Sequence, residues 1–347
     1  MKLEDTINSF IDLGHILSRY VNDDIDVSCR ENFLSIIKNA QLKNPWFTRS
    51  NVLRSIESIS TQLESKNLND WIDSYKIVNV NPRNILVIMA GNIPLVGFYD
   101  FLSVMISGHN ITVKLSSQDS ILFPFIFDLL CSCDNRFSDR LNYIENVRSR
   151  KFDAVIATGS DSSAMHFEYY FRDLPKVVRK NRKSIAVING LETNNDLEKL
   201  SDDIFLYFGL GCRNVSKLFL PSGYDLDCLF SSFFEFSSTF LDHQKYMNNY
   251  DYNKAVFLMG QHKFLDNGFL IMKEDMSFHS PVSVLYYEFY DNLSYVNNFL
   301  TVNEPRLQCV VSNDLSVKKS VRFGESQSPS LFDYPDNIDL LEFLMMV

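Results

Sequence analysis

Four short apolar runs between residues 84 and 190 constrain the fold of this chain more than any other feature. They are NILVIMA (84–90), ITVKLSS (111–117), FDAVIATGS (152–160) and SIAVING (184–190). Continuous apolar runs of this length are typical of parallel strands that are buried on both faces. Helix-like segments such as residues 93–108 and 162–174 lie between them. This alternation predicts an α/β fold with a parallel sheet and right-handed crossovers.

The regions on either side of these runs have different patterns. Residues 1–78 carry apolar side chains at three- and four-residue intervals, which predicts helices. After residue 212, four segments resemble a second set of strands: 215–221, 254–260, 283–291 and 307–314. We therefore expect a second α/β unit, with a boundary near residue 205.

Charge and cysteine content exclude several classes of protein. The 347 residues include 43 acidic and 33 basic ones, a net charge of −10, which argues against nucleic acid or an anionic membrane as the main partner. The first 17 residues lack the features of a signal peptide, so a cytoplasmic location is expected. The six cysteines are irregularly spaced and predict neither a disulfide framework nor a zinc site. The basic segment KVVRKNRKS (176–184) is interpreted as a solvated loop.

Polar residues follow the predicted strands at their carboxyl ends, where open α/β sheets bind ligands. These residues are Asn92, Lys114, Ser116, Ser117, Gly159 and Ser160. A lysine and a serine at one strand end favour contact with a ribose hydroxyl or a phosphate. A Gly-Ser pair that opens a helix offers backbone N–H groups to a diphosphate, although it is also an ordinary helix cap. Together these residues indicate a dinucleotide site without the conventional G-x-G-x-x-G motif.

Cys212, in the segment FGLGCRNVSKLFLP (208–221), allows two hypotheses. It is either a nucleophile in a site loop or an inert thiol in a tight turn. A glycine-flanked turn at a helix N-terminus would lower the pKa of the thiol, with Arg213 as a nearby helper. The other cysteines lack such surroundings and are expected in the core.

The order of these motifs resembles the aldehyde dehydrogenase superfamily. The run MAGNIPLVGFYDFLSVMISGHNITVKLSSQDS (89–120), then ATGS (157–160), then GLGC (209–212) follows the superfamily's succession of motifs. The closer resemblance is to the LuxC-like acyl-CoA reductases, whose C-terminal segment is similar to RFGESQSPSLFDYPDNIDLLEFL (322–344). It implies an aldehyde-dehydrogenase-like fold in which a Rossmann-type parallel-sheet cofactor domain is joined to an α/β catalytic domain.

The resemblance also implies roles for individual residues. Cys212 matches the catalytic cysteine, and Asn92 matches the asparagine that helps to hold the oxyanion. Lys114 and Ser116 or Ser117 match contacts to the adenosine ribose or its 2′-phosphate. Gly159 and Ser160 match the turn that faces the cofactor diphosphate.

Two departures from the superfamily pattern concern its glutamates. Arg179 or a neighbour stands where aldehyde dehydrogenases carry the glutamate that activates water. Ser277 stands where a second glutamate contacts a cofactor ribose. The loss of the water-activating base counts against a hydrolytic enzyme and favours a reductase. His279 or another group is left as the proton donor.

The resulting hypothesis is a reductase that converts an acyl thioester to an aldehyde through an acyl-cysteine. NADPH is favoured over NADH because Lys114 suits a 2′-phosphate. Acyl-CoA and a carrier-bound acyl group both remain as substrates, and a homo-oligomer stays open. The alternatives are a cysteine acyltransferase or thioesterase, and a non-catalytic acyl-carrier-binding protein. The expected parts are a helical N-terminal segment (1–80), a dinucleotide-binding domain (81–205), a catalytic domain (206–320) and a C-terminal tail (321–347).

Overall fold

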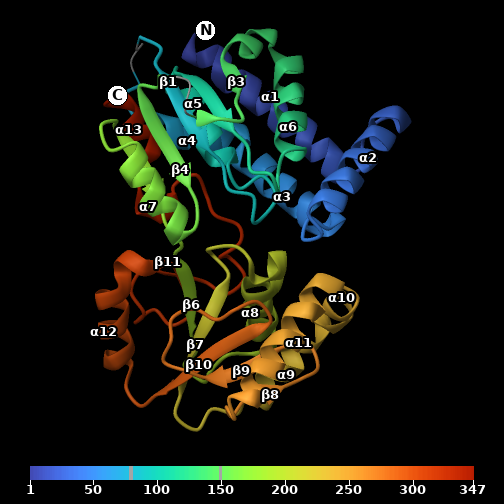
Figure 1. The fold of residues 1–347 in the computed structure, drawn as a ribbon, viewed down its shortest axis with the longest axis vertical. Helices are drawn as coiled ribbons and strands as arrows, with labels where there is room; N and C mark the ends of the chain where they lie inside the picture. The colour runs from blue at the N-terminus through green and yellow to red at the C-terminus, as the bar shows by residue number, and fades with distance from the viewer. Residues whose placement is uncertain (78–80, 148–150) are drawn as a thin grey trace. The chain divides into compact units, whose positions relative to one another are not determined.

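The computed structural model describes residues 1–77, 81–147 and 151–347. These residues form two compact units. The first comprises Met1–Asn181 together with Pro329–Val347, and the second comprises Arg182–Ser328. Figure 1 shows the chain coloured from its N-terminus to its C-terminus.

Four helices form the N-terminal part of the first unit, as the apolar periodicity predicts. They are α1 (Leu3–Val21), α2 (Val27–Lys43), α3 (Arg49–Gln62) and α4 (Ser65–Asp73). Phe10, Leu13 and Leu17 lie on one face of α1 and are fully buried. Because α1 packs against α3 and α6 (Leu122–Cys133), the N-terminal helices belong to the first unit.

The described part of the first unit contains a five-stranded parallel sheet. Its strands are β1 (Asn84–Ile88), β2 (Asn110–Lys114), β3 (Leu141–Tyr143), β4 (Ala154–Thr158) and β5 (Lys176–Arg179). They lie in the order β3-β2-β1-β4-β5, with Ile88 paired to Lys114 and Thr158 paired to Arg179 at their carboxyl ends. The strand order reverses at β1, and this is the place in an α/β sheet where ligands bind.

The remaining helices of this unit connect or cover its strands. They are α5 (Phe98–Ile106), α6, α7 (Asp161–Tyr170) and α13 (Leu340–Met345). Helix α5 ends before Gly108, whose φ of +87° is the left-handed conformation that glycine favours at a helix C-terminus. The last helix, α13, is dark red in Figure 1 and returns to the first unit, where it packs against α5.

The second unit contains a seven-stranded sheet in its described residues. The strands are β6 (Lys183–Val187), β7 (Val215–Pro221), β8 (Leu265–Asp266), β9 (Ile271–Glu274), β10 (Val284–Tyr290), β11 (Leu307–Val311) and β12 (Ser320–Val321). Their order is β12-β11-β6-β7-β10-β9-β8, and the β8–β9 pairing is antiparallel. The helices are α8 (Asn194–Phe205), α9 (Asp227–Phe233), α10 (Ser237–Leu241), α11 (Gln244–Met259) and α12 (Leu293–Asn303).

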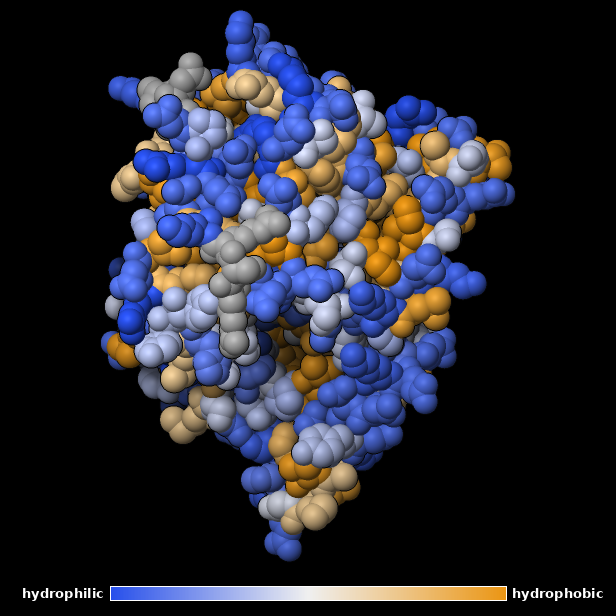
Figure 2. Space-filling model, turned by 45° about the horizontal axis from the view of Figure 1, so that its top comes forward, coloured by the Kyte–Doolittle hydropathy of each residue, from blue (hydrophilic) through white to orange (hydrophobic). Residues whose placement is uncertain are grey.

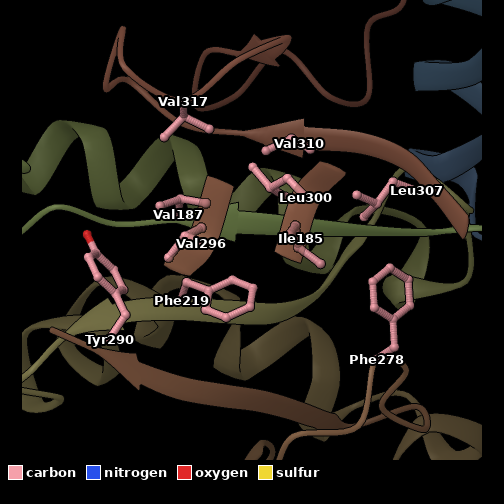
Figure 3. Packing of buried hydrophobic residues seen from close by; sticks show 10 residues of the cluster. All are labelled: Ile185, Val187, Phe219, Phe278, Tyr290, Val296, Leu300, Leu307, Val310 and Val317. Atoms are coloured by element: carbon pink, nitrogen blue, oxygen red, sulfur yellow. The ribbon is translucent and has the colours of Figure 1, made fainter. Parts of the chain in front are cut away.

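An apolar cluster between this sheet and α12 forms one core of the second unit (Figure 3). Ile185 and Val187 come from β6, Phe219 from β7 and Val310 from β11. Val296 and Leu300 of α12 pack onto these strand residues. Burial of large apolar side chains of this kind contributes roughly 1.5–3 kcal/mol per residue relative to exposure.

The structure corrects two sequence-based expectations about secondary structure. Residues 254–260 were expected to form a strand but continue α11, which buries Tyr246, Tyr250, Asn253 and Phe257 at helical spacing. The basic segment 176–184 was interpreted as a solvated loop, but it contains β5 and the start of β6. Apolar content alone does not distinguish a strand from a buried helical turn, because the two differ only in periodicity.

The compact units also divide the chain at other positions than the sequence suggested. The first continuous stretch of the first unit ends at residue 181, before the expected boundary near 205. Strand β6 was grouped with the earlier runs but pairs with β7 and β11 in the second sheet. The expected tail is shared, since residues 321–328 belong to the second unit and 329–347 to the first.

Hydrophilic residues dominate the face of the surface shown in Figure 2, with hydrophobic ones scattered between them. Among the residues that the structure describes, no helix is both long and apolar enough to cross a membrane.

Candidate functional site

The carboxyl edge of the first sheet brings together the candidate residues of that unit. Strands β1, β2 and β4 run parallel in adjacent positions, so the segments after them lie along one edge. Asn92 is in the turn between β1 and α5, Lys114 ends β2, and Gly159 follows β4. Both Asn92 and Lys114 are half-buried.

The loop that carries Asn92 is held by side chains from three separate segments. Ser55 of α3 donates a hydrogen bond to the Pro94 carbonyl at 2.7 Å, and the Leu95 N–H donates to Asp119 Oδ2 at 2.8 Å. Asn44, which caps α2, donates to the Gly91 carbonyl at 3.4 Å. These bonds fix the backbone of residues 91–97, which we call the Asn92 loop.

Leu95 gives this loop an uncommon backbone conformation. Its φ is +58°, in the left-handed region that residues with a side chain rarely occupy. Such a conformation costs of the order of 1–3 kcal/mol and persists where the surrounding contacts determine it. The bond from the Leu95 N–H to Asp119 is one such contact.

Ser116 lies so close to the Asn92 loop that residue 91 must be glycine. A Cβ atom added at Gly91 would stand 2.6 Å from Ser116 Oγ. Ser116 also forms an isolated bridge with Asp119, while Ser117 is exposed. The segment after β2 is therefore packed directly against the loop after β1.

Gly159 and Ser160 form a helix start, as predicted. Ser160 Oγ accepts a hydrogen bond from the Ser163 N–H at 3.3 Å and so caps α7. A Cβ atom at Gly159 would stand 2.9 Å from Ser163 Cβ, so the turn requires a glycine for close packing. The N–H groups at a helix start favour an anionic ligand, but the capping role accounts for Ser160 without one.

Asp119 is a buried carboxyl at this edge that the sequence analysis did not single out. Burial raises its pKa to about 6, although the backbone N–H of Leu95 acts in the opposite direction. The backbone N–H of Leu122 also lowers the pKa of this carboxyl, whose Oδ1 is buried. An acidic residue two positions after Ser117 was the only available signal, because the contact with Leu95 is set by the fold.

Arg179 ends β5 and forms a buried ion pair in the first unit. Its Nη1 donates to Asp100 Oδ1 at 2.5 Å, and the two side chains are 7% and 3% exposed. Asp100 lies in the first turn of α5. Its partner is 79 positions away along the chain, so sequence reasoning did not find the pair.

Cys212, in the second unit, lies in a turn that a buried asparagine holds in place. Asn214 Oδ1 accepts from the Gly211 N–H at 2.8 Å, and Asn214 Nδ2 donates to the Leu206 carbonyl at 2.8 Å. Ser184 at the start of β6 donates to the Cys212 carbonyl at 2.9 Å. Cys212 itself is half-buried and forms no disulfide.

The backbone before Cys212 is strained. Tyr207, Phe208 and Gly209 have consecutive φ values of +53°, +58° and +73°. Two of these residues carry bulky side chains, and left-handed conformations of such residues occur often at functional sites. The turn leads into β7, as the apolar run 215–221 predicts, so Cys212 does not lie at a helix N-terminus that would lower the pKa of its thiol.

The structure does not support every expectation about the residues that were considered together with Cys212. Arg213, considered as a helper, donates from Nε to the Ser326 carbonyl at 2.5 Å and from Nη2 to Cys309 Sγ at 3.9 Å. Both bonds direct its guanidinium toward residues outside the turn. Cys228 was expected in the core but is exposed. Ser277, which stands where the superfamily has its second glutamate, is also exposed. The candidate proton donor His279 is exposed as well.

Comparison with known proteins identifies the family. A model of the acyl-CoA reductase (LuxC) family matches residues 30–228, which is more than half of the chain. No curated protein matches the chain.

Solved structures with a similar fold include several aldehyde dehydrogenases. The AldA indole-3-acetaldehyde dehydrogenase of P. syringae is similar at a TM-score of 0.65 and 12% identity, covering 92% of this chain and 74% of that one. An NAD-dependent aldehyde dehydrogenase from Sinorhizobium meliloti has a TM-score of 0.65 and 10% identity, covering 91% and 72%. The AldH of Staphylococcus aureus gives 0.57 and 14%, covering 90% and 77%.

These comparisons confirm the predicted aldehyde-dehydrogenase-like fold. They also agree with the resemblance that the ordered motifs had indicated. The chain belongs to the LuxC family of acyl-CoA reductases.

Proposed function

We propose that this chain reduces an acyl thioester to an aldehyde, with Cys212 as the nucleophile. The observation that carries the proposal is the anchored turn around Cys212, in a chain that belongs to the acyl-CoA reductases. Asn214 and Ser184 hold this turn from both sides, and the residues before it have strained backbones. Such an arrangement keeps a thiol in one position while leaving it partly accessible.

In the first half of the proposed reaction, the Cys212 thiolate attacks the carbonyl carbon of the acyl thioester. The new carbon–sulfur bond forms as the carbonyl electrons move to oxygen. The thiolate of the leaving group then departs and takes up a proton, so that the acyl group remains on Cys212. The oxyanion needs hydrogen-bond donors, and we assign them to the Asn92 side-chain amide and the Cys212 N–H. One donor of this kind contributes roughly 3 kcal/mol to lowering the barrier.

The carboxyl edge of the first sheet fits a nicotinamide dinucleotide. Gly159 and Ser160 lead into α7, whose first N–H groups are suited to a diphosphate. Lys114, at the end of β2, supplies a positive charge for a ribose or its phosphate, with Ser116 and Ser117 beside it in the chain. When bound, the cofactor supplies the hydride that converts the acyl group to an aldehyde. Cys212 leaves again as a thiolate in that step.

The choice of cofactor rests on two observations. Five of the similar structures are of enzymes complexed with NAD+, AldA of P. syringae among them, which supports a nicotinamide nucleotide. Lys114 favours the 2′-phosphate of NADPH, since a lysine Nζ carries a full positive charge. We therefore propose NADPH, with NADH as the alternative cofactor.

A reductase of this kind must protect its acyl-cysteine from water. Where aldehyde dehydrogenases carry a glutamate that activates water, this chain has the segment RKNRKS (179–184). Arg179 is paired to Asp100, Lys180 to Glu168, and neither supplies a carboxylate base. We infer that the acyl-cysteine persists long enough to be reduced rather than hydrolysed.

The proposal is tested by following NADPH absorbance with a panel of acyl-CoAs of different chain length, while the aldehyde is trapped and quantified. We expect one aldehyde for each NADPH oxidised. Release of free CoA without NADPH oxidation would instead indicate acyl transfer or hydrolysis at Cys212. If neither occurs, even with carrier-bound acyl groups, a non-catalytic acyl-carrier-binding protein becomes the better account.

A further inference from the structure

Arg179 contacts two segments of the first unit: the turn that carries Gly159, and the first turn of α5, the helix that follows the Asn92 loop. Its backbone carbonyl accepts a hydrogen bond from the Gly159 N–H at 3.4 Å, at the turn that opens α7. Its guanidinium donates to Asp100 at 2.5 Å, in the first turn of α5. Arg179 thus connects the turn after β4 with the helix that follows the Asn92 loop.

Asp100 transmits this contact to the Asn92 loop because the loop runs directly into α5. The loop covers residues 91–97, and α5 begins at Phe98. Ser55, Asp119 and Asn44 bond the earlier part of the loop through Pro94, Leu95 and Gly91. The ion pair between Asp100 and Arg179 holds its far end.

The ion pair leaves some of the hydrogen-bond donors of Arg179 without a partner. Nε and Nη2 of Arg179 are buried without a hydrogen-bond partner, as is the hydroxyl of the adjacent Tyr99. Buried groups without partners weaken a structure, so a pair kept only for stability would be expected to satisfy them. The place of this pair, at the end of a strand, is also the edge where α/β sheets bind ligands.

We propose that Arg179 is a positioning residue, and this inference rests on the proposed function above. Through Asp100 it fixes the start of α5 and with it the Asn92 loop, so that the Asn92 amide is held for the acylation step. Through its carbonyl it keeps the Gly159 turn in register with the same edge. It acts on the reaction through these two segments and does not touch the reacting atoms.

The test uses the full-length chain with both partners of the ion pair replaced. Arg179→Met combined with Asp100→Leu removes the pair without leaving a buried charge, so the variant is expected to fold. We expect the rate of CoA release on acylation to fall about tenfold, while the cofactor KM changes less than about threefold. Arg179→Lys, which keeps the charge, is expected to restore part of the rate.

A double-mutant cycle with Asn92→Ala shows whether Arg179 acts through Asn92. If it does, removing the ion pair from the Asn92→Ala variant is expected to lower the rate of CoA release by less than about threefold. A full tenfold loss in that background, as in the wild type, would overturn the inference.

Hydrogen exchange gives a readout that does not depend on activity. We expect the amides of Leu95 and Val96 to exchange about tenfold faster when the ion pair is removed. The matched control is Arg140→Met, since Arg140 is a half-buried arginine of the same unit that bonds the Met105 and His109 carbonyls. Its loss is expected to leave the exchange of the loop unchanged.

The kinetic and hydrogen-exchange experiments together distinguish failure of this inference from failure of the proposed function. If the wild type forms no aldehyde and releases no CoA, the proposed function fails, and hydrogen exchange alone decides whether Arg179 holds the loop. Unchanged exchange in the double variant would overturn the positioning role whatever the activity. Faster exchange that matches Arg140→Met would overturn it as well.

Discussion

The two units both bury an ion pair against a β-sheet, but they satisfy the hydrogen bonds of that pair differently. In the second unit, Lys217 Nζ bonds to Glu288 at 2.5 Å and to the Met276 carbonyl at 3.1 Å, and Glu288 also accepts from Tyr295. In the first unit, Arg179 bonds to Asp100 and leaves two nitrogens without a partner. The second pair joins the interiors of β7 and β10, whereas the first lies at the end of β5.

This difference is the one expected between an ion pair that stabilises the fold and a pair that, as we propose, positions a site. Lys217 is also within 5.1 Å of the centre of the Phe219 ring, so apolar and charged groups enclose it fully. Its contacts fasten the loop after β9 to the sheet. Arg179 finds fewer partners for its buried nitrogens than Lys217 does. It lies at the edge that we assign to the cofactor and the oxyanion.

The largest expected effect concerns the second unit, which carries Cys212, the proposed nucleophile. Cys212→Ala is expected to lower aldehyde formation at least about 10³-fold, because no acyl-cysteine can form. The measurement is the rate of NADPH oxidation with acyl-CoA, accompanied by thermal unfolding to show that the fold persists. The control is Cys228→Ala, an exposed cysteine of the same unit. A Cys212→Ala enzyme with undiminished rate would remove the basis of the mechanism.

The comparison of the ion pairs is sharpened by removing one partner from each. Arg179→Met leaves the Asp100 carboxylate, 3% exposed, without its cation, and we expect a loss of about 3–5 kcal/mol in the free energy of unfolding. Lys217→Met leaves Glu288, 13% exposed and still bonded to Tyr295, so the loss is expected to be smaller.

Spectroscopy can assign these losses to a unit. Trp46 and Trp71, the two tryptophans of the chain, both belong to the first unit, so their fluorescence reports its unfolding, while circular dichroism reports both units. We expect Arg179→Met to shift the fluorescence transition in urea, and Lys217→Met to shift mainly the circular dichroism. Equal shifts of the fluorescence transition would contradict the distinction between the pairs.

Asn92 tests the contribution of the first unit to the chemistry. Asn92→Ala is expected to lower kcat by about 10²–10³-fold, since it removes one donor to the oxyanion. Asn142→Ala, at an exposed position of β3 in the same unit, serves as the control. A change in KM with an unaltered kcat would mean that Asn92 binds substrate and does not stabilise the oxyanion.

Lys114 tests the cofactor edge. Lys114→Ala is expected to raise the KM for NADPH about tenfold and the KM for NADH less, because a 2′-phosphate loses its counter-charge. Steady-state kinetics with both cofactors measures this difference, with the exposed Lys66→Ala as control. Equal effects on both cofactors would argue against a phosphate contact at Lys114.

The smallest expected effect compares a buried carboxyl in each unit. Burial raises the pKa of Asp119 in the first unit and of Asp203 in the second to about 6. A carboxyl with a raised folded-state pKa is protonated more readily in the folded chain, so its contribution to stability grows as the pH falls from about 6 toward 4. We expect each carboxyl to add about 1 kcal/mol to the free energy of unfolding when the pH is lowered from 7 to 5.

Replacing each aspartate by asparagine should remove its share of this pH dependence. Urea unfolding at pH 7 and pH 5 measures it, with tryptophan fluorescence to follow Asp119→Asn. Asp203 accepts from the N–H groups of Gly324 and Ser326, so Asp203→Asn also weakens one backbone contact at both pH values. A pH dependence that matches the wild type in either variant would show that the carboxyl does not titrate in this range.

The sequence was sufficient where the signal is local. The apolar run 215–221 coincides with β7, and the periodic patterns before residue 78 correspond to α1–α4. Gly108, the last residue of the predicted helical segment 93–108, has the left-handed conformation of a helix C-terminal glycine. Residues Asn92, Lys114 and Gly159 reach one edge because parallel strands end together, which the strand pattern implied.

Features that depend on distant partners were not predictable. Strand β6 resembles the earlier runs, yet it pairs with β7 and β11, and nothing local records this choice of sheet. Arg179 looked like part of a solvated basic loop because Asp100 is remote in sequence. The roles of the candidate site residues stay predictions, since the pattern of a motif does not report binding.

The most direct test of the account is to detect the acyl group on Cys212. Trypsin should release LSDDIFLYFGLGCR (200–213), in which Cys212 is the single cysteine, so its mass after incubation with acyl-CoA alone identifies the adduct. The account predicts an acylated peptide that persists without cofactor and disappears, with release of aldehyde, when NADPH is added. An adduct that decays to free acid regardless of NADPH, or no adduct at all, would contradict it.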